Sequence, residues 1–216
     1  MRRPTVTNPE GLVTLYHGTT LDNARRIAVE GLRAPTPAEV RTALAELEFW
    51  CGARRGATRD GFEEFALRRV GEAEVCLTTG FNHAAAYARM GPEFLYQGLC
   101  AIGRALHGDD AGEFFADEHR HHTPAVVTVV APRGEVAARA FPGRPVTDRT
   151  LDPGADDPIA TSFGLAEALQ LVGPLPAAWV TRVEVLDPCD CTDDLLLRGA
   201  DRCPTCPRDV PLAPAP

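Results

Sequence analysis

Residues 12–32 read LVTLYHGTTLDNARRIAVEGL, and this stretch decides the expected fold. Residues 12–16 form an apolar run with the length of a short buried strand, and from Leu21 the apolar residues recur at helical spacing until Gly31. The Thr19-Thr20 pair can cap the start of this helix, and Gly31 can adopt the left-handed conformation that ends it. The stretch therefore predicts a strand, a tight turn and a short helix.

The rest of the chain alternates between helical and extended patterns. The apolar spacing predicts two helices within 35–74 and further helices at 82–90 and from about 93 to 107, followed by an acidic, histidine-rich loop. Residues 142–160, with four prolines, are expected to be a loop. Strands are expected at 75–79, 125–131, 169–172 and 179–186.

Length and composition limit the class of protein. A chain of 216 residues, 44% hydrophobic and 24% charged, predicts one globular domain with room for a small appendage. The net charge of -8 argues against general coating of nucleic acid. No signal-peptide core follows the first arginines, and the longest strongly apolar run, 125–131, is too short for a bilayer. We therefore expect a cytoplasmic protein with no membrane partner.

The cysteines are concentrated near the C-terminus. Seven cysteines, an odd number, do not suit a secreted disulfide framework, and clustered thiols in a reducing compartment more often bind metal. Two short pairs of thiolates can converge tetrahedrally on zinc, so we expect a structural zinc site in a cysteine-rich tail at 188–208, followed by a disordered end at 209–216. The alternative is four unrelated free thiols. The expected zinc ligands are Cys189, Cys191, Cys203 and Cys206.

A histidine-rich stretch offers a second possible metal site. His119, His121 and His122 lie beside Asp117 and Glu118. Imidazoles crowded on a polar loop are more often solvated, and this interpretation is favoured.

Three separated segments carry residues suited to a ligand site. His17 beside Gly18 can hydrogen-bond a sugar hydroxyl while the glycine lets a ligand approach the backbone, although a histidine can also merely satisfy a turn. Tyr87, on an alanine-rich helix, can stack on a planar cationic ring or pack in the core. Glu167 precedes an apolar strand, where a solvated carboxylate is oddly placed, although most such glutamates are simply exposed.

Taken in order, these segments resemble the ADP-ribosyltransferase superfamily, in particular its His-Tyr-Glu branch of poly(ADP-ribose) polymerases and many bacterial toxins. The resemblance rests on His-Gly-Thr in a strand, Gly-Leu ending a helix, Leu-Thr-Thr in a strand, Ala-x-Tyr-Ala in a helix, and a glutamate opening a late strand. It spans residues 12–186, with unmatched insertions at 35–74 and 91–123. It implies a domain at 1–187 with an α+β fold, a split β-sandwich of two small antiparallel sheets with peripheral helices.

The resemblance also implies an enzyme that cleaves the nicotinamide-ribose bond of NAD and transfers ADP-ribose to an acceptor, which can be a protein, a nucleic acid or a small molecule. His17 matches the histidine that hydrogen-bonds the adenosine ribose, and Gly18 the residue whose backbone binds the nicotinamide carboxamide. Tyr87 matches the aromatic residue that stacks on nicotinamide, and Glu167 the catalytic glutamate. The remaining pocket positions that it implies are Thr19, Thr78 and Thr79.

Two positions depart from the family pattern. Cys76 stands where many members carry a tyrosine, and Leu165 stands where arginine-modifying relatives carry Glu or Gln, which argues against arginine as the acceptor. Three alternatives remain open. The enzyme could be an NAD glycohydrolase that uses water, or it could resemble the RNA 2'-phosphotransferases, whose arginine set has no assignable match. The chain could also be a catalytically silent module that binds ADP-ribose or a partner.

Overall fold

The computed structural model describes residues 10–50, 67, 74–90, 93–119, 122–151 and 168–186, and every structural statement below refers to these residues. The order of elements is β1 (Leu12–Thr20), α1 (Leu21–Glu30), α2 (Pro37–Trp50), β2 (Glu74–Leu77), α4 (Phe81–Met90), α5 (Glu93–His107), the 3-10 turn η1 (Asp109–Ala111), α6 (Gly112–His119), β3 (Pro124–Pro132), α7 (Arg133–Ala138), α8 (Asp148–Leu151), β4 (Leu169–Val172), η2 (Ala177–Trp179) and β5 (Val180–Val185).

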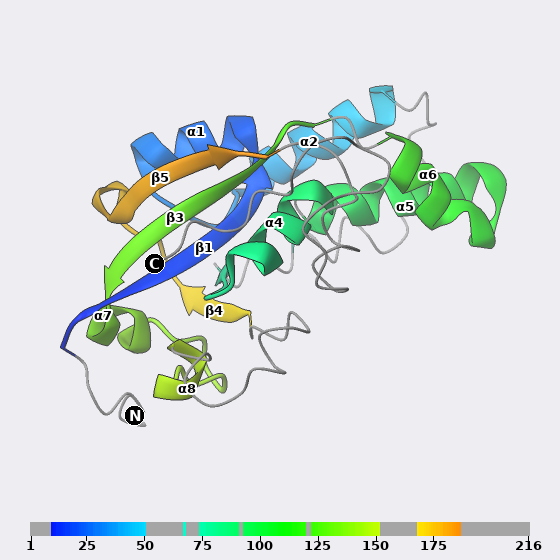
Figure 1. Ribbon diagram of the computed structural model, residues 1–216. Coiled ribbons are helices and arrows are strands. Elements are labelled where there is room, and N and C mark those ends of the chain that lie inside the picture. Colours follow the sequence, from blue (N-terminus) through cyan, green and yellow to red (C-terminus); the bar gives the residue numbers. More distant parts are fainter. Residues whose placement is uncertain are drawn as a thin grey trace, which may run out of the picture.

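The strands form two small antiparallel sheets, one of order β1-β3-β5 and one of order β2-β4. Helices surround both sheets (Figure 1). The expected α+β class with two small antiparallel sheets is confirmed. The expected strands at 169–172 and 179–186 are also present, but they belong to different sheets, because β4 pairs with β2 and β5 pairs with β3.

The two sheets meet at one pair of residues. The N–H of Tyr16 donates to the carbonyl oxygen of Thr78 at 2.7 Å, and the N–H of Thr78 donates to the carbonyl oxygen of Tyr16 at 2.9 Å. Within the described ranges this is the one β-bridge that joins them. On one side of this pair, β1 continues from His17 to Thr20 and β2 runs back from Leu77 to Glu74. The two sheets separate on that side. Beyond Tyr16, the edge of β1 is therefore not paired with β2.

The main core lies between the sheets and α1. Alternate residues of β1, such as Leu15, face this core, and α1 contributes Ala24 and Ile27 from its apolar side. The helix begins as its sequence predicts, because the hydroxyl of Thr20 accepts a hydrogen bond from the N–H of Asn23 at 3.4 Å. It ends at Gly31, whose φ of 86° is unfavourable for other residues.

Helix α4 packs on the other face of β1 and β3. A Cβ atom placed on Gly18 would lie 1.9 Å from the carbonyl oxygen of Ala84, so β1 and α4 approach more closely than any other residue at position 18 permits. Ala84, Ala85 and Ala88 supply the small side chains of this contact, together with Val126 of β3. The alanine-rich sequence of α4 is therefore explained by close packing.

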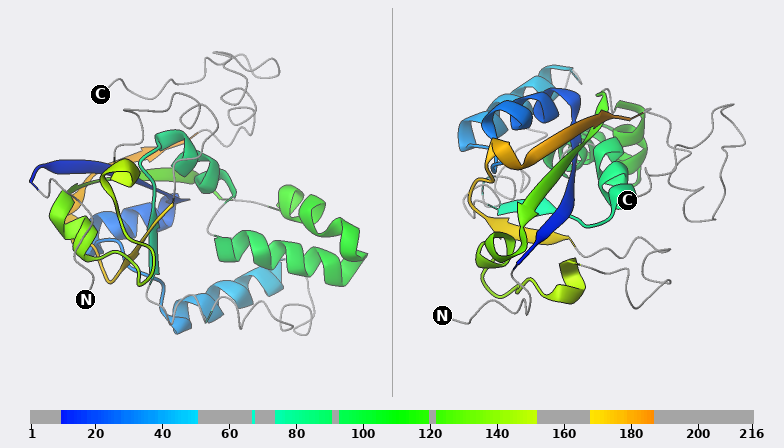
Figure 2. Two further views of the ribbon diagram at one scale, coloured as in Figure 1. Left: turned by 90° about the horizontal axis from the view of Figure 1, so that it is seen from below. Right: turned by 60° about the vertical axis from the view of Figure 1, so that its left-hand side comes forward.

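Helices α5 and α6 form an arm at one end of the molecule, beside α2 (Figure 2). The prediction of a loop after His107 is wrong, because the chain forms η1 and α6 between Asp109 and His119. Phe115 and Ala116 of α6 are buried against Leu99 and Ile102 of α5, and this packing provides a hydrophobic core for a segment whose polar composition suggested a loop. None of the helices in the described residues combines the length and apolar character that crossing a bilayer requires.

Candidate functional site

A cavity of about 970 Å³ opens at the split between the sheets. Its size lies within the range typical of ligand pockets. Its wall comes from β1, α1, the segment 31–35, α2, β2, α4, the start of α5, and residues just before and within β4, which are far apart in the sequence. The residues expected from the sequence that line it are His17, Gly18, Thr19, Thr78 and Tyr87.

His17 is held by a hydrogen bond across the split. Its Nδ1 lies 2.8 Å from the backbone carbonyl oxygen of Cys76, and because a carbonyl oxygen only accepts, Nδ1 is the donor. Burial lowers the pKa of His17 below its ordinary value of 6.5, and the hydrogen bond to Cys76 offsets only part of this effect. The neutral ring leaves Nε2 as an acceptor, and this atom has no partner among the described residues. It can therefore accept a hydrogen bond from a hydroxyl group.

The backbone of Gly18 faces the cavity edge of β1. Successive residues of a strand direct their N–H and C=O groups to opposite edges, and those of Tyr16 point to Thr78. The groups of Gly18 point to the same edge, where β2 has already diverged, and no hydrogen bond in the described structure satisfies them there. One donor and one acceptor are thus available at fixed spacing, which suits a carboxamide.

The three expected threonines differ in position. Thr19 and Thr78 line the cavity, and both are buried. The hydroxyl of Thr78 accepts a hydrogen bond from the N–H of Gly80 at 3.1 Å, which leaves its own proton for another acceptor. Thr79 does not belong to the cavity wall as described, and its buried Oγ1 has no hydrogen-bond partner in the described part of the chain.

Tyr87 presents an exposed ring to the cavity. Its side chain is 41% exposed, so the alternative that it packs in the core does not hold. The ring stacks on His83, one helical turn earlier on α4, with 5.1 Å between centroids and 13° between planes. This contact orients the ring while leaving surface for a planar ligand.

Glu167 lies outside the described residues. Its neighbour Ala168 lines the cavity, as does Gln170, whereas Leu169 and Leu171 are buried in the core. The pattern follows from the two-residue period of a strand. Gln170 is opposite Cys76 in the β2-β4 pair, and its side-chain amide makes no hydrogen bond within the described ranges. Sequence reasoning missed Gln170, although a polar residue between two leucines is a usable signal.

Arg26 and Arg33 also line the cavity and were missed. Both bind the carboxylate of Glu39, which in turn accepts a hydrogen bond from the N–H of Thr36 at the start of α2. The sequence of Thr36 followed three residues later by Glu39 is a capping-box pattern, which was a readable signal for the helix start but not for a site.

The expected metal ligands cannot be placed in the same way. Cys189, Cys191, Cys203 and Cys206 lie outside the described residues, as does His121. In the ranges that the structure does describe, no group of three or more potential ligands is assembled. His122 donates from Nε2 to the carbonyl oxygen of Ala88 at 2.8 Å, and so contacts the C-terminal part of α4.

The arrangement can hydrogen-bond sugar and amide groups, stack on a planar ring and contact an anion, all around one cavity. Comparisons of the chain with protein-family models, with curated proteins and with solved structures gave no match. The function of the site must therefore be inferred from its own geometry.

Proposed function

We propose that this protein is an NAD-dependent ADP-ribosyltransferase. The observation that carries the proposal is the convergence of His17, Gly18, Thr78 and Tyr87 on one cavity, together with Ala168, the neighbour of Glu167. These residues come from four separate stretches of the chain. A dinucleotide needs several such groups at once, because its sugars and its carboxamide require hydrogen-bonding partners and its rings require stacking partners.

Each contact has a physical basis. The free Nε2 of His17 accepts a hydrogen bond from the adenosine ribose. The unpaired edge of Gly18 binds the nicotinamide carboxamide, donating from its N–H and accepting at its carbonyl oxygen. The exposed face of Tyr87 stacks on the cationic nicotinamide ring. Although position 76 is a cysteine, the site still has an aromatic wall, because Tyr87 lines the cavity.

The reaction breaks the bond between the ribose anomeric carbon and the ring nitrogen of nicotinamide. The electron pair of this bond goes to the nitrogen, so nicotinamide leaves neutral and needs no general acid. Positive charge develops on the ribose, and a carboxylate beside it stabilises the transition state more than the ground state. We assign this role to Glu167. The acceptor then forms a bond to the anomeric carbon and loses a proton.

Nicotinamide release from labelled NAD tests the proposal. The purified protein is incubated with NAD and with cell protein, DNA, RNA or small molecules as acceptors. We expect Glu167→Gln to reduce nicotinamide release at least about tenfold, the order of one lost transition-state contact. Glu135→Gln is the matched control, because Glu135 is an exposed carboxylate on α7 and does not line the cavity. No release by the wild-type protein under any of these conditions would reject the enzyme.

The same assay separates transfer from hydrolysis. Label that appears in an acceptor identifies a transferase, whereas nicotinamide release at an equal rate without acceptor, with free ADP-ribose as the product, identifies an NAD glycohydrolase. Binding of ADP-ribose without any nicotinamide release identifies a silent binding module.

A further inference from the structure

A pair of arginines borders the cavity on the side of α1 and α2. Arg26 belongs to α1, and Arg33 follows its end. Two guanidinium groups at one site repel each other, and the carboxylate of Glu39 lies between them and binds both. The side chains of all three residues are about one-third exposed, so the cluster is neither fully buried nor an ordinary surface ion pair.

The hydrogen bonds of Glu39 are fully used. Its Oε1 accepts from Arg26 and, at 2.8 Å, from Nη2 of Arg33. Its Oε2 accepts from Nη1 of Arg33 at 2.8 Å and from the N–H of Thr36 at 2.6 Å. These contacts hold the pKa of Glu39 far below its usual range, with the hydrogen bond from Arg33 as the largest cause. Glu39 is therefore a fixed brace that offsets one of the two positive charges.

Most of the guanidinium N–H groups of this pair that have no partner among the described residues belong to Arg26. A guanidinium has five N–H groups. Arg26 uses one for Glu39 and one for the side-chain oxygen of Asn23 at 3.2 Å, and the other three have no partner in the part of the chain that is described. Arg33 is more fully engaged, because it binds both oxygens of Glu39 and the carbonyl oxygen of Ala34, and lies 3.6 Å from Glu30.

We propose that Arg26 binds the diphosphate of a nucleotide in the cavity, with Arg33 and Glu39 holding its guanidinium in place. Taking that nucleotide to be NAD rests on the proposed function. A guanidinium matches phosphate oxygens in a two-pronged geometry, and a brace that fixes its orientation lowers the entropy lost on binding. Glu46, the other carboxylate of α2 in the cavity wall, is seven residues from Glu39, about 10 Å along the helix axis, and so borders a different part of the cavity.

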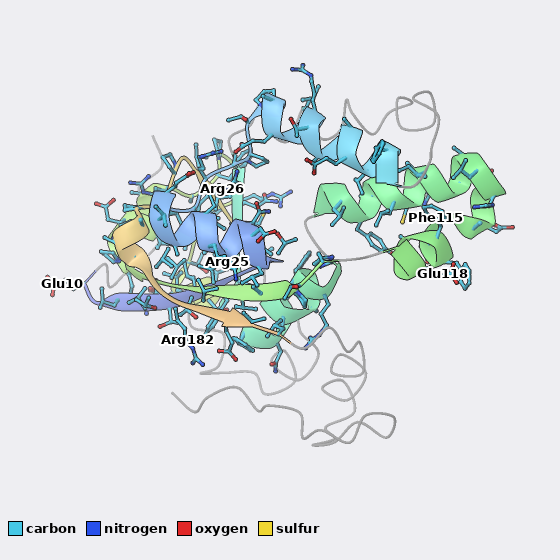
Figure 3. All side chains as sticks on the ribbon, turned by 90° about the horizontal axis from the view of Figure 1, so that it is seen from above. Glu10, Arg25, Arg26, Phe115, Glu118 and Arg182 are labelled. Carbon is cyan, nitrogen blue, oxygen red and sulfur yellow. The ribbon has the colours of Figure 1, made fainter. Side chains whose placement is uncertain are left out.

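The chain offers a matched control in the preceding residue. Arg25 carries the same charge on the same helix, but it is not part of the cavity wall. Its side chain is 69% exposed and lies 3.5 Å from Asp22. Figure 3 shows both arginines on α1. Replacing Arg25 changes the net charge by the same amount as replacing Arg26, so long-range electrostatics affect both variants alike.

Calorimetric titration with ADP and with adenosine tests the inference, since the two ligands differ by the diphosphate. We expect the wild-type protein to bind ADP at least about tenfold more tightly than adenosine, the order of one charge-assisted hydrogen-bonded pair. Arg26→Gln should remove this preference and leave adenosine affinity within about twofold, whereas Arg25→Gln should retain it. Equal effects of the two variants on ADP, or no preference for ADP in the wild type, would overturn the inference.

A second variant guards against a folding defect. Arg26→Lys keeps the positive charge and an ion pair with Glu39 but loses the two-pronged geometry, so we expect part of the ADP preference to remain. Thermal unfolding of each variant shows whether it is folded at the titration temperature. Loss of ADP preference in Arg26→Gln without NAD cleavage by the wild type would support the anion site and reject the enzyme. NAD cleavage by the wild type together with an unchanged ADP preference in Arg26→Gln would support the enzyme and reject the anion site at Arg26.

Discussion

Nδ1 of His17 lies 2.8 Å from the carbonyl oxygen of Cys76, and this hydrogen bond crosses the point at which β1 and β2 part. A continued antiparallel pairing would place Gly18 opposite Cys76. The side chain of His17 instead reaches the carbonyl oxygen of Cys76, and the backbone groups of Gly18 remain available to a ligand. This one contact fixes the tautomer of His17 and links β1 to β2 beyond the point where their backbone pairing stops.

The lowered pKa of His17 predicts a specific dependence of stability on pH. The unfolded chain takes up a proton here near pH 6.5, while the folded protein does so only at lower pH. The free energy of unfolding should therefore fall as the pH drops below about 6.5 toward the folded-state pKa. His17→Gln removes this contribution, so its urea-unfolding free energy should decrease less over the same window. Parallel slopes for the two proteins would contradict the assignment.

Gly18→Ala should destabilise the protein by pressing α4 away from β1. The added Cβ would lie 1.9 Å from the carbonyl oxygen of Ala84 and 2.7 Å from the backbone nitrogen of Ala88, and neither atom belongs to a flexible side chain. We expect a loss of about 1–3 kcal/mol in the free energy of unfolding, measured by urea denaturation. Thr14→Ala, at an exposed position on the same strand, is the control and should cost less than about 0.5 kcal/mol. A similar small loss at Gly18 would mean that α4 adjusts freely.

Tyr87→Ala should weaken NAD binding with little effect on folding, because the ring is exposed rather than packed in the core. Stacking of one base on an aromatic ring contributes about 1–3 kcal/mol, which corresponds to a rise of roughly five- to 150-fold in the dissociation constant. Tyr87→Phe keeps the ring and should retain the affinity. Phe114→Ala removes another exposed aromatic ring, 66% exposed on α6 and away from the cavity wall, and should leave binding unchanged.

Gln170→Ala should weaken NAD binding, because Gln170 supplies amide donors and an acceptor to the cavity opposite Cys76. A net hydrogen bond contributes about 1 kcal/mol, so we expect roughly a fivefold higher dissociation constant. Val172→Ala is the control, since Val172 lies on the same strand two residues further on, is 37% exposed and does not line the cavity. Equal dissociation constants for wild type and Gln170→Ala would remove Gln170 from the site.

The cysteine-rich tail is expected to bind one zinc ion per chain, measured by elemental analysis of the purified protein. Thiolate ligands must be deprotonated, so zinc retention should fall at acidic pH. Cys203→Ser together with Cys206→Ser should abolish zinc binding, whereas Cys100→Ser, at a buried position on α5, should not. Zinc content that is unaffected by the tail substitutions would place the metal elsewhere.

The sequence by itself determined the local elements. The period of apolar residues predicted a strand from Leu12, a helix ending before Gly31, the helix at 93–107 and the strands at 125–131 and 169–172, and the structure has elements at each of these places. These signals suffice because a strand or an amphipathic helix is encoded by neighbouring residues. The tight turn expected at 17–20 is wrong, because β1 continues to Thr20, and the loop expected at 142–160 is wrong in part, because it contains α8. In α6 the local sequence pattern was weak, and burial of Phe115 against α5 stabilises the helix instead.

Only the tertiary structure decided how the expected polar groups are held and which further ones, Arg26, Arg33 and Gln170, face the cavity. The hydrogen-bond partner of His17 is 59 residues away, and the carboxylate that binds Arg26 is on another helix. Alternation with Leu169 and Leu171 turns Gln170 away from the core, but only the pairing of β4 with β2 brings it opposite Cys76 at the cavity. The physical reason is that a ligand site depends on distances between segments, which arise from packing and strand pairing rather than from the spacing of residues along the chain.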